Sequence, residues 1–334
     1  MRNRLAVRAR LGIVCGTISL LLCSAAAAQE ASSPLTLRAS DGHGIHIFPT
    51  VNLAPALPPD SGPLVYNGGP VMQASVSTYA IFWIPASGKL QNGGATSMTA
   101  HYQTVNKNML GDYPGHGLDN NNTQYYQISS KTTQYIQNKG GLAASYVDTD
   151  SYPSSGCSDS ATPGNCITDA QLETELQKVM TLKGWTGGLN KVFEVFTSSG
   201  EGSCFDSSSS SCAYVQYCAY HSYYLNGSTP VVYSNEPFGD PSVCQNPGQP
   251  SPNSDPDADT AATAAAHELT EATTDPELDA WYTAQGNEIG DLCAYNYGTN
   301  TWDSAKANQM WNGRFYELQM MFSNHHPGCV QVGP

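Results

Sequence analysis

The chain has 334 residues, with 14 Lys and Arg against 28 Asp and Glu, and a formal net charge of −14. So few cations exclude a protein whose main task is to neutralise a nucleic-acid backbone. Charged residues make up 13% and hydrophobic residues 40% of the chain, so the sequence can bury a core and is not a disordered polymer.

The N-terminus has the features of a secretory signal peptide. Four arginines lie within the first ten residues, an apolar run covers residues 11–22, and the small residues SAAAA follow at 24–28. This order is typical of an export signal over residues 1–28. The apolar run is shorter than the ~20 residues that a membrane span needs, and no later segment is long and apolar enough. We therefore expect a secreted protein, extracellular or periplasmic, without a membrane span.

The cysteines agree with export. Eight remain after residue 28, an even number, which in an exported chain indicates four disulfides. The pairs that we expect are Cys157–Cys166, Cys204–Cys212, Cys218–Cys244 and Cys293–Cys329. A zinc–thiolate cluster is disfavoured because the chain has no CxxC pair.

Residues 29–60 contain Pro, Ser and scattered apolar residues without a period, and we interpret them as a poorly ordered leader or propeptide. His43 and His46 lie there. An unstructured pair is the simpler interpretation, and blocking of a metal by one of them is the alternative if the leader is a propeptide. Residues 61–334 are then the folded domain.

The folded part predicts both strands and helices. Strands are expected over 71–85, 191–197, 214–224 and 231–233, from their β-branched, aromatic or alternating residues. Three helices are expected. The first covers residues 98–109, the second begins after a capping box at Thr168 and Gln171, and the third covers the alanine-rich residues 257–275. We predict one α+β domain, a twisted mixed sheet braced by disulfides.

The last helix carries the strongest chemical signal, His267-Glu268-Leu269-Thr270-Glu271. His267 and Glu271 are four residues apart, so they lie on one helix face and can hold one metal ion. Glu268 follows the first ligand and can act as a general base on a metal-bound water. A solvated helix face is the alternative interpretation of this pentapeptide.

The surrounding residues resemble the thermolysin-like gluzincins, with HELTEATTD at 267–275 and NEIGD at 287–291. The gluzincin helix reads HELTHAxTD, and its next motif, NExxSD, is one residue longer than the motif here. The resemblance implies a zincin-like metal helix, Glu288 as third metal ligand, and Asp291 as the carboxylate that orients His267.

A second resemblance, to the Exordium or phosphate-induced-protein family, extends from about residue 66 to residue 329. It rests on YNGGPVM at 66–72, CAYH at 218–221, WY at 281–282 and EIGDLC at 288–293. It implies an exported, cell-wall-associated protein. Plant members tend to lack the histidine–glutamate helix, so the resemblance leaves open a non-catalytic binding or signalling protein, with cell-wall polysaccharide as a possible partner.

One divalent metal is the expected cofactor, zinc first. Because two of the three ligands His267, Glu271 and Glu288 are carboxylates, manganese and calcium also fit. His221 is a candidate catalytic residue that stabilises the oxyanion. It can also replace Glu288 as third ligand, or be a buried structural histidine. His325 and His326 lie beside Pro327 and predict a surface turn.

These observations favour a secreted metallopeptidase that acts as a monomer on peptides or proteins. Two alternatives stay open. One is a non-catalytic Exordium-like protein, and the other is a structural metal that ties the last helix to the Glu288 loop.

Overall fold

The computed structural model describes residues 35–54, 60–86, 98–245, 248–302 and 304–334. A seven-stranded sheet forms its centre, in the order β1-β2-β11-β12-β9-β4-β7. The strands are β1 (Thr36–Arg38), β2 (Gly44–Pro49), β4 (Val76–Trp83), β7 (Gly140–Asp148), β9 (Lys191–Thr197), β11 (Tyr217–Asn226) and β12 (Thr229–Glu236).

The sheet is mixed in direction. Strands β12, β9, β4 and β7 pair in parallel, and β1, β2, β11 and β12 pair antiparallel. Strand β9 coincides with the predicted range 191–197, and β4, β11 and β12 overlap the other predicted strands. The prediction of a mixed sheet braced by disulfides is confirmed.

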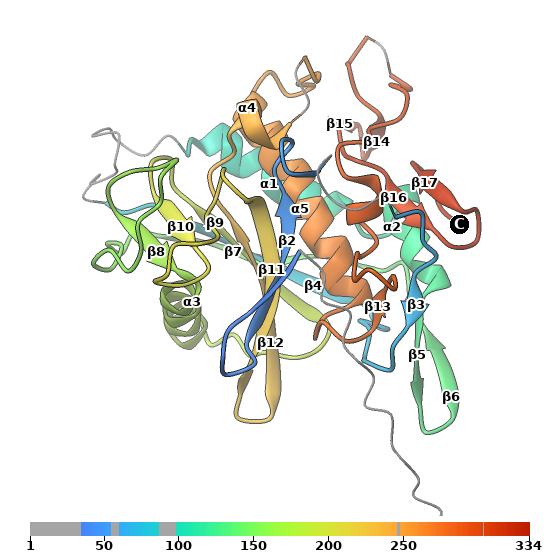
Figure 1. Cartoon of the computed structure of the whole chain (residues 1–334). Coiled ribbons are helices and arrows are strands. Elements are labelled where there is room, and N and C mark those ends of the chain that lie inside the picture. Colours follow the sequence, from blue (N-terminus) through green and yellow to red (C-terminus); the bar gives the residue numbers. More distant parts are fainter. Residues whose placement is uncertain (1–34, 55–59, 87–97, 246–247, 303) are drawn as a thin grey trace, which may run out of the picture. The chain divides into compact units, whose positions relative to one another are not determined.

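Helices cover both faces of the sheet. Helices α1 (Ala100–Asp112) and α5 (Pro256–Thr274) lie on one face, and α3 (Asp169–Lys183) lies on the other (Figure 1). Alternation along β4 shows the two layers, because Phe82 belongs to the core with α1 and α5, whereas Ile81 belongs to the core with α3. The sheet thus places α5 in the interior of the protein.

Local signals explain where the helices begin and end. Thr168 and Gln171 form the predicted capping box of α3. Asp255 caps α5 by accepting a hydrogen bond from the amide of Ala258, and Pro256 occupies the first turn, where its missing N–H costs nothing. Every α5 residue from Ala258 to Thr274 is buried, because its many alanines let the helix lie close to its neighbours.

The remaining elements are short. They are β3 (Val65–Tyr66), β5 (Tyr126–Ser129), β6 (Thr132–Tyr135), β8 (Cys166–Thr168), β10 (Gly202–Cys204), β13 (Trp281–Tyr282), β14 (Gln309–Trp311), β15 (Arg314–Tyr316), β16 (Met321–Ser323), β17 (Gly328–Val330), the helices α2 (Gly117–Asn120) and α4 (Pro241–Cys244), and the 3-10 turns η2 (Asn121–Gln124) and η3 (Asp291–Cys293). His325 and His326 are exposed in the turn between β16 and β17, as predicted.

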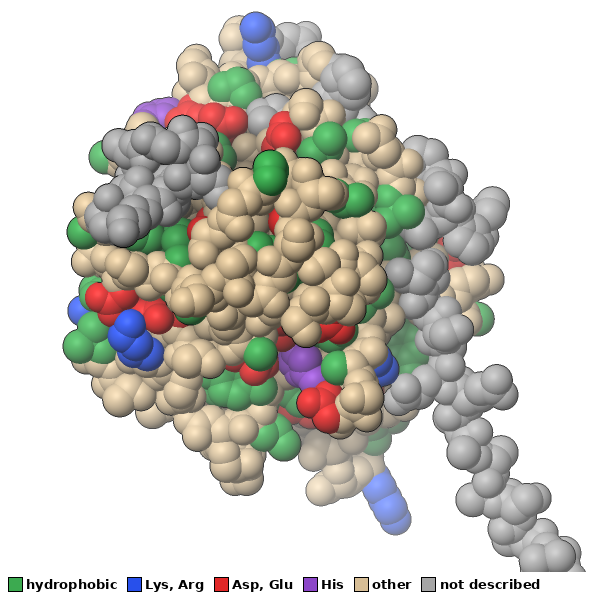
Figure 2. Space-filling model, turned by 60° about the vertical axis from the view of Figure 1, so that its left-hand side comes forward, with side chains coloured by type: hydrophobic (Ala, Val, Ile, Leu, Met, Phe, Trp, Pro, Cys, Tyr) green, Lys and Arg blue, Asp and Glu red, His purple; other side chains and the backbone are tan. Residues whose placement is uncertain are grey.

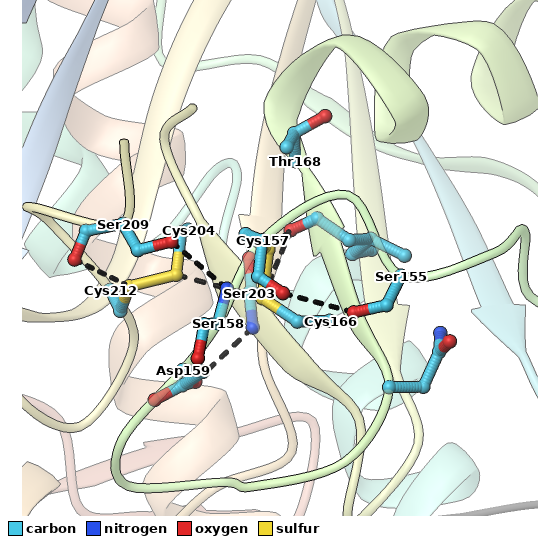
Figure 3. Close-up of a disulfide and its surroundings, with 12 residues drawn as sticks. Ser155, Cys157, Ser158, Asp159, Cys166, Thr168, Ser203, Cys204, Ser209 and Cys212 are labelled. Carbon is cyan, nitrogen blue, oxygen red and sulfur yellow. Dashed lines mark hydrogen bonds between the residues drawn. A yellow bond between two sulfur atoms is a disulfide. The ribbon is translucent and has the colours of Figure 1, made fainter. Parts of the chain in front are cut away.

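Four cysteine pairs lie at bonding distance: Cys157–Cys166, Cys204–Cys212, Cys218–Cys244 and Cys293–Cys329. All four predicted pairs are confirmed. Figure 3 shows two of them side by side, where β8 pairs with β10. The amide of Ser158 donates to Ser209 Oγ at 2.9 Å there, so the loops that carry the two bridges also contact each other.

The structure differs from the prediction of a poorly ordered leader. Residues 35–54 include β1 and β2, and all six residues of β2 are buried. Strand β2 pairs with β11 along its length (Figure 1). The pattern of residues 44–48, GIHIF, supports a strand, because Ile45 and Ile47 join the core with α3 while His46 lies on the other face. The folded part therefore begins well before residue 61.

Every helix among the described residues is too short or too polar to cross a membrane. Figure 2 shows one face of the molecule, on which Lys and Arg side chains are few and lie apart.

Candidate metal centre

Helix α5 carries three ionisable side chains at the centre of the protein. His267, Glu268 and Glu271 are each 0% exposed. His267 Nε2 lies 3.1 Å from Glu271 Oε2, one helical turn away. The predicted convergence of His267 and Glu271 on one helix face is therefore present, and the face is buried and not solvated.

The segment from Glu288 to Asp291, which leads into η3, adds two more carboxylates. Glu271 Oε1 accepts hydrogen bonds from the amides of Gly290 and Asp291, at 3.0 and 3.2 Å. The amide of Glu288 donates to Asp291 Oδ2 at 2.7 Å. A Cβ atom on Gly290 would lie 2.6 Å from His267 Nδ1. A glycine at this position thus lets the segment approach α5.

His221 reaches the centre from β11. Its Nδ1 lies 3.0 Å from Glu268 Oε2, and its Nε2 lies 3.8 Å from Glu288 Oε2. A proton on Nδ1, donated to Glu268, leaves the lone pair of Nε2 facing Glu288. This is how carboxylates commonly orient a metal-binding histidine. The geometry favours His221 as a ligand over His221 as an oxyanion donor.

His46 reaches the centre from β2, in a segment that the sequence assigned to the leader. Its Nε2 lies 2.8 Å from Asp291 Oδ2, and its Nδ1 lies 2.9 Å from Thr36 Oγ1 and 3.3 Å from Glu288 Oε1. It pairs directly with His221 in the β2–β11 register. Alternation of the residues in β2 was the available signal for this position, and it was missed.

Gln319 contacts His267 where Asp291 was expected. Gln319 Nε2 lies 2.9 Å from His267 Nδ1 and 3.0 Å from the carbonyl oxygen of Gly290. Asp291 contacts His46 instead, and its nearer oxygen is 3.8 Å from His267 Nε2. The predicted role of Asp291 in orienting His267 stays a prediction, because Asp291 lies within ion-pair distance of His267 but makes its hydrogen bond to His46. No motif in the sequence pointed to Gln319.

The centre is rich in polar atoms that lack a hydrogen bond. Among the described residues, the buried side-chain atoms without a partner include His221 Nε2, His267 Nε2, Glu271 Oε2, Glu288 Oε2 and Asp291 Oδ1. Such atoms are costly in a protein interior unless something binds them. One imidazole or carboxylate atom from each of five residues thus faces the centre, and imidazole and carboxylate donors of this kind fit a divalent ion.

Burial and crowding shift the ionisation of these groups. Burial, with the charge of Glu271 and other neighbouring acids, raises the pKa of Glu268 well above its ordinary value. Burial and the charge of Asp275 do the same to the pKa of Glu288. Burial also acts to raise the pKa of Asp291, but the charges of His46 and His267 outweigh it and the pKa is lowered. Burial and mutual repulsion thus favour the protonated forms of Glu268 and Glu288, whereas the neighbouring histidines favour the ionised form of Asp291.

The centre is closed to solvent. Its histidine and carboxylate side chains are at most 2% exposed. A hollow of about 550 Å³ is lined by Tyr295, Tyr297 and Glu317, among others. The ring of Tyr295 stacks on Phe48, with centroids 5.0 Å apart, and Phe48 stacks on His267 at 4.3 Å. Two aromatic rings thus connect this hollow to the first predicted ligand.

Comparison of the chain with protein-family models, with curated proteins and with solved structures gave no match.

Proposed function

We propose that the protein is an exported, metal-dependent peptidase whose ion is held by His267, Glu271, Glu288 and His221. The observation that carries the proposal is the convergence of buried donor atoms without hydrogen bonds at one place in the core. Four disulfides support an oxidising, extracellular or periplasmic setting. Zinc suits two imidazoles with two carboxylates, and manganese also accepts this donor set.

Glu268 is the proposed general base. Its Oε2 accepts from His221, while its Oε1 has no hydrogen-bond partner among the described residues. An ion in this centre supplies the field that lowers the pKa of an attacking water. Glu268 then takes the proton of that water as oxygen attacks the peptide carbonyl. The C–N bond breaks, and the proton passes to the leaving amine.

The burial of every donor favours a second candidate, a structural metal in a non-catalytic exported protein. A peptide must reach the ion to be cleaved, and the centre's side chains are at most 2% exposed. The resemblance to the Exordium family supports the same alternative. For a peptidase, we propose that substrate enters from the hollow beside Tyr295, by displacing the rings of Tyr295 and Phe48.

The test is metal analysis and casein cleavage with the full chain, purified after export. We expect bound zinc or manganese and cleavage that a chelator abolishes. Glu268→Gln should keep the metal, because the glutamine oxygen still accepts from His221, and should lose cleavage. Glu201→Gln is the matched control, since Glu201 is also buried and accepts a hydrogen bond from Asn165 but lies outside the centre. A metal-loaded protein without cleavage supports the structural alternative, and a metal-free protein contradicts both.

A further inference from the structure

The centre holds more donors than one ion requires. Three histidines and four carboxylates meet there: His46, His221, His267, Glu268, Glu271, Glu288 and Asp291. They form three overlapping groups whose ligand atoms lie within 4.8 Å of one another, and Glu271 belongs to all three. The proposed ion uses His221, His267, Glu271 and Glu288. His46 and Asp291 form the third group with Glu271.

Asp291 lies between two histidines. Its Oδ2 is 2.8 Å from His46 Nε2, and its Oδ1 is 3.8 Å from His267 Nε2. Two ligand atoms that share one ion at ~2.1 Å lie roughly 3–3.5 Å apart, so the His46–Asp291 contact has nearly the spacing of a shared ion. Asp291 therefore has one oxygen toward each of two histidines, and the oxygen on the His46 side is the one placed to share an ion with His46.

His46 is held in the orientation that a ligand needs. Thr36 Oγ1 and Glu288 Oε1 lie 2.9 and 3.3 Å from its Nδ1, so a proton on Nδ1 has acceptors. Its Nε2 lies 2.8 Å from Asp291 Oδ2. A proton on Nε2 makes this contact a hydrogen bond, and a cation bound by both atoms would take the place of that proton. His221 shows the same pattern, with Nδ1 against Glu268 and Nε2 toward Glu288.

We propose that the centre holds two divalent cations, the second bound by His46 Nε2 and Asp291, with Glu271 shared between the two. This rests on the metal site of the proposed function and extends it to a two-metal centre. Two ions about 3.5–4 Å apart stabilise the attacking and the leaving atoms of a hydrolysis together. The N-terminal strand β2 then supplies a metal ligand.

The test is the metal content of the full chain, purified after export, dialysed against zinc and freed of loose ions. We expect two equivalents per chain for the wild type and one for His46→Ala. His43→Ala is the matched control, because His43 lies just before β2, contacts Asp169 and not the centre, and should keep two. One equivalent in the wild type, or two in His46→Ala, overturns the inference and leaves the proposed function standing. No bound metal overturns both.

A second measurement needs no variant. After loading with Mn²⁺, two ions that share a carboxylate should give the broad, exchange-coupled electron paramagnetic resonance spectrum of a manganese pair. The six-line spectrum of isolated Mn²⁺ at full loading contradicts the second ion even if His46→Ala fails to fold.

Discussion

Gly290→Ala should damage the proposed metal centre without removing any of the proposed ligands. A Cβ atom at this position would lie 2.6 Å from His267 Nδ1, 2.7 Å from its Cε1 and 2.9 Å from Glu271 Oε1. Ordinary contacts to a Cβ begin at about 3.4 Å, so the overlap with the ring is close to 0.8 Å. Both neighbours project from α5 and are fully buried, so neither can withdraw into solvent.

The size of the effect follows from these contacts. Overpacking of a filled core costs about 1–3 kcal/mol, and we expect a loss in this range from the free energy of unfolding. The Gly290 segment must also retreat from Glu271, which weakens the hydrogen bonds that hold this carboxylate. Loss of such supporting contacts typically lowers metal affinity ~10–100-fold.

The assay is chelator competition for the metal, with urea unfolding of the same samples. Gly111→Ala is the matched control, because a Cβ at Gly111 in α1 lies 3.8 Å from its nearest neighbour. That substitution should leave metal affinity unchanged and raise stability by up to ~1 kcal/mol. Equal metal affinity in Gly290→Ala and the wild type would refute the assignment of His267 and Glu271 as ligands.

Three further predictions follow from other parts of the structure. A chelator should lower the melting temperature of the wild type and leave Glu271→Ala nearly unaffected, measured by calorimetry, since metal binding stabilises only the folded state. Replacing both Cys293 and Cys329 by Ser should cost roughly 2–4 kcal/mol in urea unfolding, because that bridge spans 36 residues; a cost below ~1 kcal/mol would contradict the bridge. Burial raises the pKa of Glu201 from 4.5 to about 8. The folded protein therefore binds the proton of the Glu201 carboxyl more tightly than the unfolded chain does. The free energy of unfolding is then highest below pH ~5 and falls as the pH rises toward 8. Unfolding curves should show the loss, on the order of 4 kcal/mol, in the wild type and not in Glu201→Gln.

The sequence predicted the elements that local signals determine. Helix α3 follows its capping box, β9 follows alternation, and α5 follows a long segment without Gly that ends before Pro276. The contact between His267 and Glu271 was predictable for the same reason, because helical geometry alone brings residues i and i+4 together. The disulfides followed from pairing each cysteine with its neighbour along the chain.

The contacts that the sequence did not predict join residues that lie far apart along the chain. His46 and Asp291 are 245 residues apart, and Gln319 and His267 are 52 apart. Nothing in the residues around Gln319 indicates that its amide meets an imidazole. The composition of residues 29–60 is typical of a leader. The short alternating strand β2 within it was not predicted, because its burial depends on pairing with β11.

The direct pairing of His46 with His221 has a consequence for assembly of the protein. Side chains alternate along a strand, so a slip of β2 by one residue against β11 would turn His46 to the opposite face and bring an isoleucine toward the acids. Such a misaligned strand would offer a cation no imidazole and would leave carboxylates uncompensated. Binding of the proposed ions would therefore stabilise only the correctly aligned strand, and would select the correct register at the N-terminal edge of the sheet.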